Sequence, residues 1–170
     1  MDFLKLAQDR YSCKKYSDRQ VPDDILKQIL EAGRLAPTAK NLQEQHIYVC
    51  RSEEALAMID KVTPCRYGAR TVLAVAYDKD NVYTSPDGTF KSGVEDASIV
   101  ATYMMLAAAA LKVDSCWVNR FFPRELHSLM NLPENEEFLL LMDLGYAAEG
   151  AGPLPNHFSR KPLSDTVTYL

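Results

Sequence analysis

The sequence predicts an α+β (α/β-like) domain in which helices flank a central sheet. Two helical segments come first, and apolar runs of strand length then alternate with further helical segments. One of these runs, residues 71–77, is almost entirely apolar, which is typical of a strand covered on both faces. We expect a single domain over residues 1–170, because no repeat, low-complexity segment or linker divides the chain.

The chain is predicted to begin with two helices. Asp2 can cap a short helix over residues 3–9, in which apolar residues recur at helical spacing. A polar, basic stretch over residues 10–17, called the basic segment below, separates it from the second helix. That helix begins at Pro22 and ends near Leu35, because a second proline follows and cannot continue it.

Seven further elements are expected, with a turn-rich loop over residues 78–93 before the long helix. In order, they are a strand over 46–50, a helix capped by Ser52, a strand over 71–77, a long helix over 94–111, a strand over 115–119, a helix opened by Pro123 and a strand over 138–144. The tail after Gly145 is rich in glycine and proline, so it should cross a surface before a short extended end over residues 166–170.

The long helix has almost no polar face. It combines large apolar residues over 99–106 with four consecutive alanines over 107–110. A helix that is apolar all round must be buried all round, and alanines allow another helix to approach closely. Two explanations remain open, namely burial inside the domain and burial at an interface between two subunits.

Composition excludes several classes of protein. The net charge of −4 argues against a nucleic-acid binder, which would need a basic field. The longest uncharged stretch, residues 97–111, is shorter than the roughly 20 residues of a membrane span, so we expect no membrane partner. The N-terminus lacks the basic and apolar regions of a signal peptide. These features predict a cytoplasmic protein.

No motif supplies a catalytic side chain or a metal site. The four cysteines form no Cys-x-x-Cys pair and are expected to be reduced thiols: Cys13, Cys50, Cys65 and Cys116. The three histidines lie in unrelated segments, and nucleophile-elbow, phosphate-loop and dinucleotide motifs are absent. If the chain is an enzyme, a cofactor must therefore supply its reactivity.

Three polar clusters stand apart from the core pattern. In the basic segment, extended geometry would turn Arg10, Ser12 and Lys14 to one side, where two cations and a hydroxyl suit a phosphate or a polarised carbonyl. The same spacing is also typical of a solvated basic loop. A basic pair in the tail, Arg160 and Lys161, is either a phosphate clamp or an exposed pair.

The third cluster is residues 36–43, called the amide segment below. Its Asn41 and Gln43 both donate and accept hydrogen bonds, which suits a heterocycle with alternating donors and acceptors, such as a flavin or a pterin. The alternative is a helix C-terminal loop whose amides satisfy the local backbone.

Taken together, these clusters resemble the FMN-dependent nitroreductase family in order and spacing. Five motifs resemble those of that family: Arg10-Tyr11-Ser12-Cys13-Lys14-Lys15-Tyr16, residues 36–45, the helix that opens at Asp96 and leads into Ser115-Cys116-Trp117, residues 144–149 and Arg160-Lys161-Pro162-Leu163. The resemblance covers essentially the whole chain.

The resemblance implies a central mixed, mainly antiparallel sheet flanked by helices, with the long helix buried at the interface of a homodimer. It further implies that FMN binds at this interface. The residues expected to bind FMN are Arg10, Tyr11, Ser12, Lys14, Arg160 and Lys161 near the phosphate, ribityl chain and polar ring edge, the backbone of Trp117, Val118 and Asn119 beside the ring, and Pro37, Thr38, Asn41 and Gln43 from the partner subunit.

The activity that the resemblance implies is ping-pong hydride transfer from NADH or NADPH through FMN to a small acceptor such as a nitroaromatic or a quinone. No protein side chain need act as an acid or a base. Two alternatives remain open on the same scaffold. One is a flavin-binding protein for storage or sensing, and the other is a different flavin reduction, such as enone reduction or dehalogenation.

Several positions depart from the family pattern. Glu44-Gln45 replaces Pro-Trp, Lys40 replaces a common glycine, Ala147 replaces a proline, and Lys112 and Asp114 replace two glycines. The chain is also short for the family, so that only the loop around residues 83–93 is available to roof the site. An open substrate pocket is therefore expected.

Overall fold

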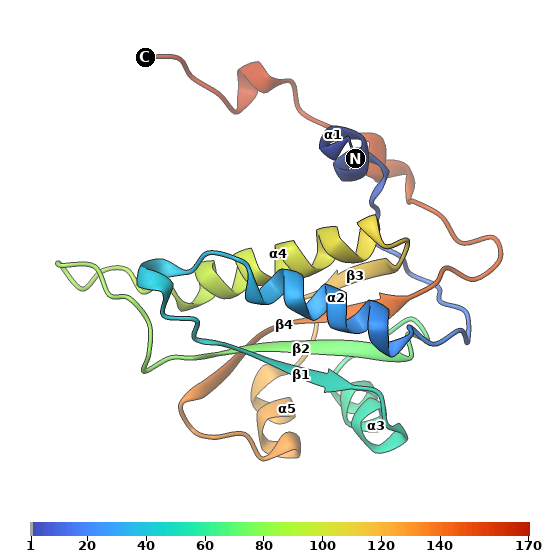
Figure 1. Cartoon of the computed structure of the whole chain (residues 1–170), viewed down its shortest axis with the longest axis horizontal. Coiled ribbons are helices and arrows are strands. Elements are labelled where there is room, and N and C mark those ends of the chain that lie inside the picture. The colour runs from blue at the N-terminus through green and yellow to red at the C-terminus, as the bar shows by residue number, and fades with distance from the viewer. Residues whose placement is uncertain (1) are drawn as a thin grey trace.

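The computed structural model describes residues 2–170 (Figure 1). Its centre is a four-stranded sheet with the order β1-β2-β4-β3. The strands are β1 (Gln45–Cys50), β2 (Thr71–Asp78), β3 (Asp114–Val118) and β4 (Glu136–Gly145). All three pairs of neighbouring strands are antiparallel. Within residues 2–170, parallel pairing is limited to one bridge between Ser12 and Ser115, so the expected mixed sheet is almost purely antiparallel.

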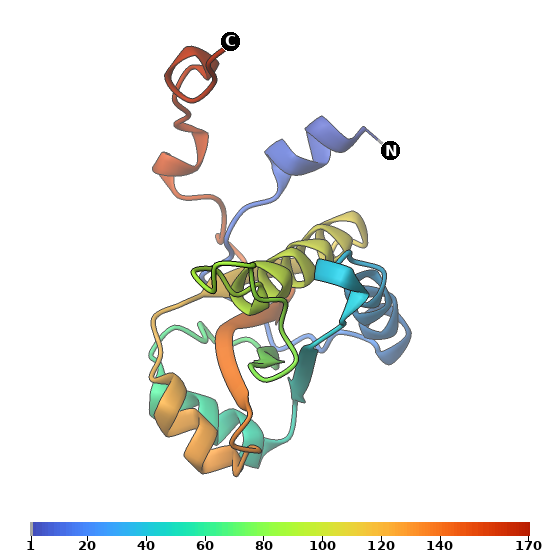
Figure 2. The ribbon, with the colours of Figure 1, turned by 90° about the vertical axis from the view of Figure 1, so that its left-hand side faces the viewer.

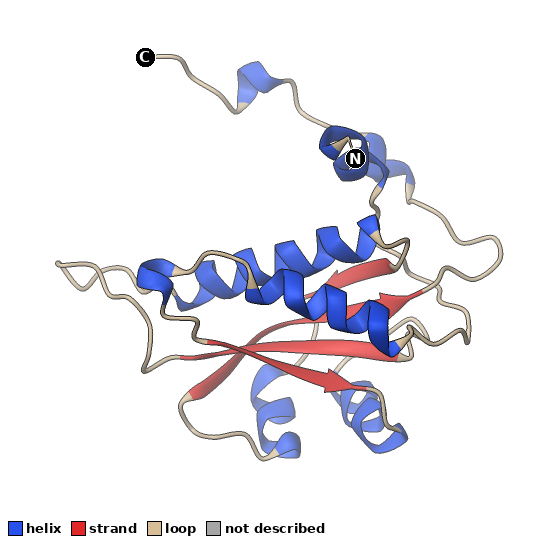
Figure 3. Ribbon diagram, in the orientation of Figure 1, coloured by secondary structure: helices blue, strands red, loops and turns tan. Residues whose placement is uncertain are grey.

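The helices lie on both faces of the sheet (Figures 1 and 3). Helices α2 (Asp23–Arg34) and α4 (Gly93–Ala110) pack on one face, and α3 (Glu53–Val62) and α5 (Pro123–Met130) pack on the other. Each face has its own apolar core, because β2 and β4 are central strands whose side chains are buried in both directions. The α+β fold predicted from the sequence is thus confirmed.

Local signals account for the helix ends. Asp2 accepts hydrogen bonds from the backbone N–H groups of Leu4 and Lys5, and thereby begins α1 (Phe3–Asp9). Ser52 caps α3 in the same way through the N–H of Ala55. The element ends differ from the predicted ones by one or two residues, which is the usual uncertainty of helix and strand boundaries. The short 3-10 helices η1 (Ala39–Asn41), η2 (Pro155–Phe158) and η3 (Leu163–Asp165) were not predicted.

The tail follows the surface of its own domain only as far as His157, which contacts Gln8 of α1, and its second half departs from the sequence-based expectation. Figures 1 and 2 show it leaving the body of the molecule beside α1 and extending beyond it. The final residues, 163–170, are exposed, including apolar Leu163 and Tyr169.

Helix α4 is only half covered. One face packs on the sheet and on α2, whereas Val94 and Tyr103 on the other side are 53% and 43% exposed. A purely internal position, one of the two explanations left open by the sequence, is therefore excluded. Among residues 2–170, no helix has both the length and the hydropathy that crossing a membrane requires.

We predict that Gly33→Val will lower the free energy of unfolding by about 2 kcal/mol, because a Cβ at Gly33 would lie 2.7 Å from Met104 Cγ and overpack the contact between α2 and α4. Chemical denaturation measures this effect. Lys27→Val adds the same branched side chain at an exposed position of α2 and should change stability far less. Equal effects of the two substitutions would contradict the close packing at Gly33.

Candidate functional site

The basic segment is held against the sheet by backbone hydrogen bonds. Helix α1 ends at Asp9, and the chain turns extended at Arg10. The N–H of Cys13 then donates to Ser115 O at 3.0 Å, beside the parallel bridge that joins Ser12 to Ser115. Further along, the N–H of Tyr16 donates to Tyr67 O at 3.1 Å. The segment therefore lies along the outer edge of β3, at its start.

Burial decides which side chains of this segment face outward. Cys13 and Tyr16 are buried in a small cluster with Ala69. Since alternate residues of an extended chain point in opposite directions, burial of Cys13 turns its neighbours Ser12 and Lys14 away from this cluster.

Ser12 and Lys14 line a cavity of about 500 Å³, called the edge cavity below. The other residues that line it come from the basic segment, the loop after α3, the second half of β3 and the tail: Tyr11, Cys65, Tyr67, Cys116, Trp117, Val118, Asn119, Arg120, Leu154, Asn156 and His157. The cavity thus combines cationic and hydroxyl side chains with aromatic rings. This combination can bind a ligand that has both an anionic group and a flat ring.

Strand β3 contributes backbone groups to the edge cavity. It pairs with β4 on one side only, and the basic segment covers its other edge only near Ser115. An edge strand leaves part of its N–H and C=O groups unpaired, so residues 117–119 can bind the polar edge of a heterocycle. The indole N–H of Trp117 donates to Asn119 Oδ1 at 2.8 Å, which fixes the orientation of this ring.

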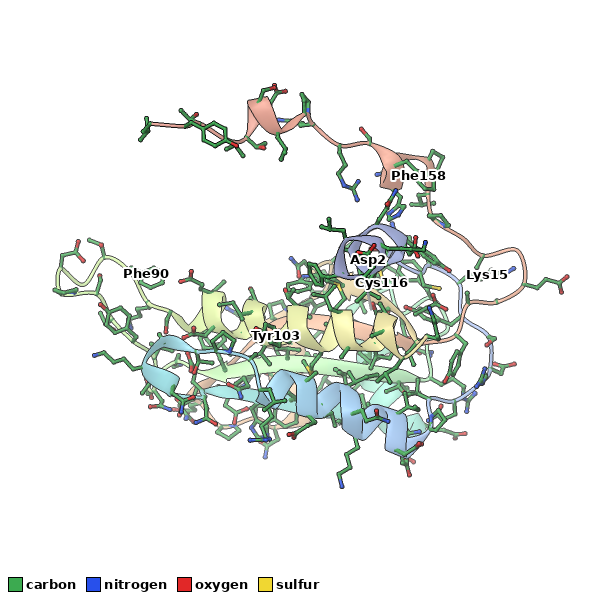
Figure 4. The ribbon with its side chains drawn as sticks, turned by 45° about the horizontal axis from the view of Figure 1, so that its top comes forward. Asp2, Lys15, Phe90, Tyr103, Cys116 and Phe158 are labelled. Carbon is green, nitrogen blue, oxygen red and sulfur yellow. The ribbon has the colours of Figure 1, made fainter. Side chains whose placement is uncertain are left out.

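The amide segment lies at the opposite end of α4 from the edge cavity. The N–H of Ala39 donates to Asp96 Oδ1 at 2.9 Å, in the first turn of α4. The edge cavity lies toward the other end of this helix, and the fourteen residue steps from Asp96 to Ala110 span about 21 Å. Figure 4 shows the same separation, with Phe90 near one end of α4 and Cys116 near the other. Within one chain, Pro37, Thr38, Asn41 and Gln43 therefore do not meet the edge cavity.

Three other expected site residues also lie outside the edge cavity. Arg160 and Lys161 are exposed on the tail, where Arg160 Nη1 donates to the carbonyl oxygens of His157 and Ser159. Arg10 lines a neighbouring hollow of about 370 Å³ between α1 and the end of α4. Of the predicted residues, the structure gathers Tyr11, Ser12, Lys14, Trp117, Val118 and Asn119.

Sequence reasoning missed six polar residues of the edge cavity: Cys65, Tyr67, Cys116, Arg120, Asn156 and His157. Arg120 directly follows the predicted strand and could have been found by extending that motif by one residue. Tyr67 lies in a loop with a left-handed φ of 53°, and no sequence signal points to it. His157 reaches the cavity only because the tail folds beside α1, where the His157 Nε2 atom lies 3.1 Å from Gln8 O.

Comparison with known proteins shows the family to which this chain belongs. The sequence profile described as the Nitroreductase family matches residues 7–65 and 63–146. The chain belongs to the nitroreductase family. A relative from Methanothermobacter thermautotrophicus, provisionally named NADH dehydrogenase/NAD(P)H nitroreductase, is 31% identical over 160 residues, which cover 89% of this chain and 81% of that protein.

Solved structures show the same nitroreductase fold. A nitroreductase family protein from Clostridium difficile is 35% identical, with a TM-score of 0.93 over 99% of this chain and 98% of the other. A provisionally named nitroreductase from Exiguobacterium sibiricum, crystallised in complex with FMN, is 18% identical, with a TM-score of 0.87 over 100% of this chain and 98% of the other. These likenesses confirm the fold that the motifs implied.

The structure explains several departures from the nitroreductase motifs. Lys40 and Lys112 stand where those motifs carry glycine, and both have a left-handed φ, of 52° and 61°. Glycine adopts this conformation without strain, which accounts for the family preference. Asp114 and Ala147 depart as a pair, because the N–H of Ala147 donates to Asp114 Oδ2 at 2.9 Å and a proline at 147 would have no N–H to donate.

Next to the edge cavity, the paired strand residues Cys116 and Asp143 are both neutral at pH 7. Asp143 on β4 is 1% exposed, and its Oδ2 atom has no hydrogen-bond partner within the described residues. Burial raises the pKa of Asp143 to about 9, although the charge of Arg66 opposes the shift. Burial, followed by the charge of Asp143, raises the pKa of Cys116 to about 12. The four cysteines are free and buried, and the Cys116 thiol is protonated and no nucleophile at neutral pH.

Asp143 should make the protein less stable as the pH rises. Because its pKa is raised from 3.8 to about 9 in the folded state, folding retains a proton that the unfolded chain releases between these values. We therefore expect the free energy of unfolding to fall across this range. Asp143→Asn should remove this slope and raise stability near pH 8 by about 1 kcal/mol or more, measured by denaturation at several pH values.

The slopes of wild type and Asp143→Asn are best compared between about pH 7 and pH 9. The pKa of Glu44 is raised to about 7, so Glu44 contributes to the slope mainly below this range. Asp18→Asn, at an exposed position, serves as the control and should leave the slope unchanged. A wild-type slope that survives in Asp143→Asn would show that Asp143 is not its source.

Proposed function

We propose that this chain is an FMN-dependent oxidoreductase that transfers hydride from NADH or NADPH to a small acceptor, such as a nitroaromatic or a quinone, in a ping-pong reaction. The observation that carries the proposal is the edge cavity itself. There the pairing of Cys13 with Ser115 holds Ser12 and Lys14 beside the half-open edge of β3. Membership of the nitroreductase family and the FMN complex of a protein with the same fold support it.

The residues of the edge cavity fit the polar parts of FMN. Lys14 supplies a cation, and Ser12 and Tyr11 supply hydroxyl groups for the phosphate, the ribityl chain or the polar edge of the ring. We assign Arg10, Arg160 and Lys161 to the phosphate as well: Arg10 lines the neighbouring hollow, and the other two are exposed on the tail shortly after His157, which lines the edge cavity.

The ring end of the site is assigned to Trp117, Val118 and Asn119. Unpaired backbone groups at the edge of β3 suit the donors and acceptors of the isoalloxazine ring. Bound FMN supplies the hydride-transfer chemistry, and the protein binds it, orients it and stabilises negative charge on the ring through nearby cations. A protonated Cys116 in the cavity agrees with a reaction that needs no acidic or basic side chain.

We further infer that the active form is a homodimer. The amide segment contacts the first turn of α4 and does not line the edge cavity, so one chain alone does not complete the proposed site. A twofold axis beside α4 would bring the amide segment of one chain to the edge cavity of the other. The half-exposed face of α4 and the exposed apolar residues of the tail, among them Phe158 and Tyr169, are the surfaces that such a dimer would cover. Pro37, Thr38, Asn41 and Gln43 would then contact FMN across the interface.

The basic test is an ultraviolet–visible spectrum of the purified protein, followed by anaerobic titration with each nicotinamide. We expect a flavin absorption band at about 450 nm, and we expect NADH or NADPH to bleach it. A colourless protein that takes up no added FMN would refute the proposal. A yellow protein that neither nicotinamide reduces would instead support a flavin store or sensor. We also infer a cytoplasmic location, which the four free thiols support.

Lys14→Glu should weaken FMN binding by roughly 30-fold or more, because a charge-assisted hydrogen bond contributes about 2 kcal/mol and the substitution replaces attraction with repulsion. Quenching of flavin fluorescence measures the affinity. Lys15→Glu is a matched control, since Lys15 Nζ donates to Glu149 O and does not line the edge cavity (Figure 4). If both substitutions weakened binding equally, Lys14 would not have the assigned role.

Tyr103→Asp should convert the dimer into a monomer and abolish FMN uptake, because it places a charge on the exposed face of α4. Size-exclusion chromatography with light scattering reports the mass. Val49→Asp changes a residue of similar exposure on β1, away from α4, and should leave the dimer intact. A wild-type protein that is monomeric at micromolar concentration would refute the dimer.

A further inference from the structure

Two carboxyl groups are buried together behind the amide segment. Glu44 follows this segment, and Asp96 lies in the first turn of α4; each is only 4% exposed. Their outer oxygens, Glu44 Oε2 and Asp96 Oδ2, have no hydrogen-bond partner when both groups are ionised. Ser92 joins the two residues, because its hydroxyl donates to Glu44 Oε1 at 3.4 Å and its carbonyl oxygen accepts from the N–H of Asp96 at 2.8 Å. A single shared proton would satisfy both oxygens.

The groups around Glu44 and Asp96 do not cancel the negative charge of this pair. Ser92 Oγ donates to Glu44 Oε1 at 3.4 Å, and the backbone N–H of Tyr83 donates to Ser92 Oγ. On the amide segment, Lys40 lies over the ring of Tyr83, 4.8 Å from its centroid. Among residues 2–170, Lys40 makes no ion pair with Glu44 or Asp96.

Other charged groups near the pair are turned elsewhere. Lys91, just before α4, and Glu95, in its first turn, are exposed to solvent. Asp78, at the end of β2, meets this region through its backbone N–H, which donates to Glu44 O at 2.9 Å. Burial, together with the hydrogen bond and charge of Asp96, raises the pKa of Glu44 to about 7.

The amide segment needs such a support because its backbone is strained. Lys40, Asn41 and Gln43 all have a left-handed φ, of 52°, 56° and 54°. Such residues cost free energy and persist only where the surrounding structure holds them. Two hydrogen bonds do so here, from the N–H of Ala39 to Asp96 and from the N–H of Gln43 to the hydroxyl of Thr38.

We propose that Glu44 and Asp96 are positioning residues that, by sharing one proton, lock the amide segment in the conformation that presents Asn41 and Gln43 to FMN bound by the partner subunit. This inference rests on the proposed function. It also explains the departure at position 44, since the proline of the family motif could not share a proton with Asp96.

The lock should open as the pH rises. Because the pKa of Glu44 is raised to about 7, Glu44 holds the shared proton below that value and loses it above. Two buried carboxylates then repel one another, and the hydrogen bond from the N–H of Ala39 to Asp96 no longer has a fixed acceptor. FMN affinity, and protection of the amide segment from hydrogen exchange, should therefore both fall between about pH 6 and pH 8.

Two variants and a control test the shared proton. Glu44→Gln replaces it with an amide N–H that does not titrate, so the variant should bind FMN at about pH 8 as tightly as at pH 6. Glu44→Ala removes the contact and should bind roughly tenfold more weakly than wild type at pH 6, with little further change at pH 8. Glu95→Gln, at an exposed position beside Asp96, should keep the wild-type profile, including any effect of pH on FMN itself.

Hydrogen exchange of the apo protein provides a readout that needs no flavin. Protection factors of residues 38–43 should fall with pH in wild type and stay constant in Glu44→Gln. Constant protection in wild type, or Glu44→Gln behaving like Glu44→Ala, would overturn the positioning role. Wild type that takes up no FMN at any pH would instead refute the proposed function, and the exchange experiment would still decide whether the pair locks the segment.

Discussion

The site depends on one short contact, the pairing of residues 12–13 with Ser115 at the start of β3. This contact covers just enough of an edge strand to anchor the basic segment, and it leaves the following backbone of β3 free. Burial of Cys13 and Tyr16 then decides the direction in which Lys14 points. A longer pairing would occupy the free backbone groups at the edge of β3. Without the pairing, Lys14 would have no fixed position beside that edge.

Local chemistry made most elements of the fold predictable. The caps at Asp2 and Ser52, the proline that begins the second helix and the apolar run of β2 all correspond to elements in the structure. The strand order could not be derived in the same way, because it depends on which strands are covered on both faces after folding. Nor could the course of the tail, whose last residues lie exposed beyond the body of the domain (Figure 1).

The site was predictable where its residues follow one another along the chain. Ser12, Lys14 and Trp117 come together because each lies on an extended segment with a clear direction. Tyr67 and His157 reach the cavity through a left-handed loop and through the tail, and neither leaves a pattern in the sequence. A departure from a family motif is easier to understand when its contact is known. Asp114 accepts a hydrogen bond from the N–H of Ala147, and Glu44 is buried against the carboxyl group of Asp96.

The separation of the two clusters along α4 has a genetic consequence. In the proposed homodimer each chain carries two unlike half-sites, and each complete site draws one half from either chain. A chain damaged only in the basic segment and a chain damaged only in the amide segment would each be inactive alone. Co-expressed, they would form mixed dimers in which one of the two sites is assembled entirely from undamaged halves, so that two defective alleles complement each other.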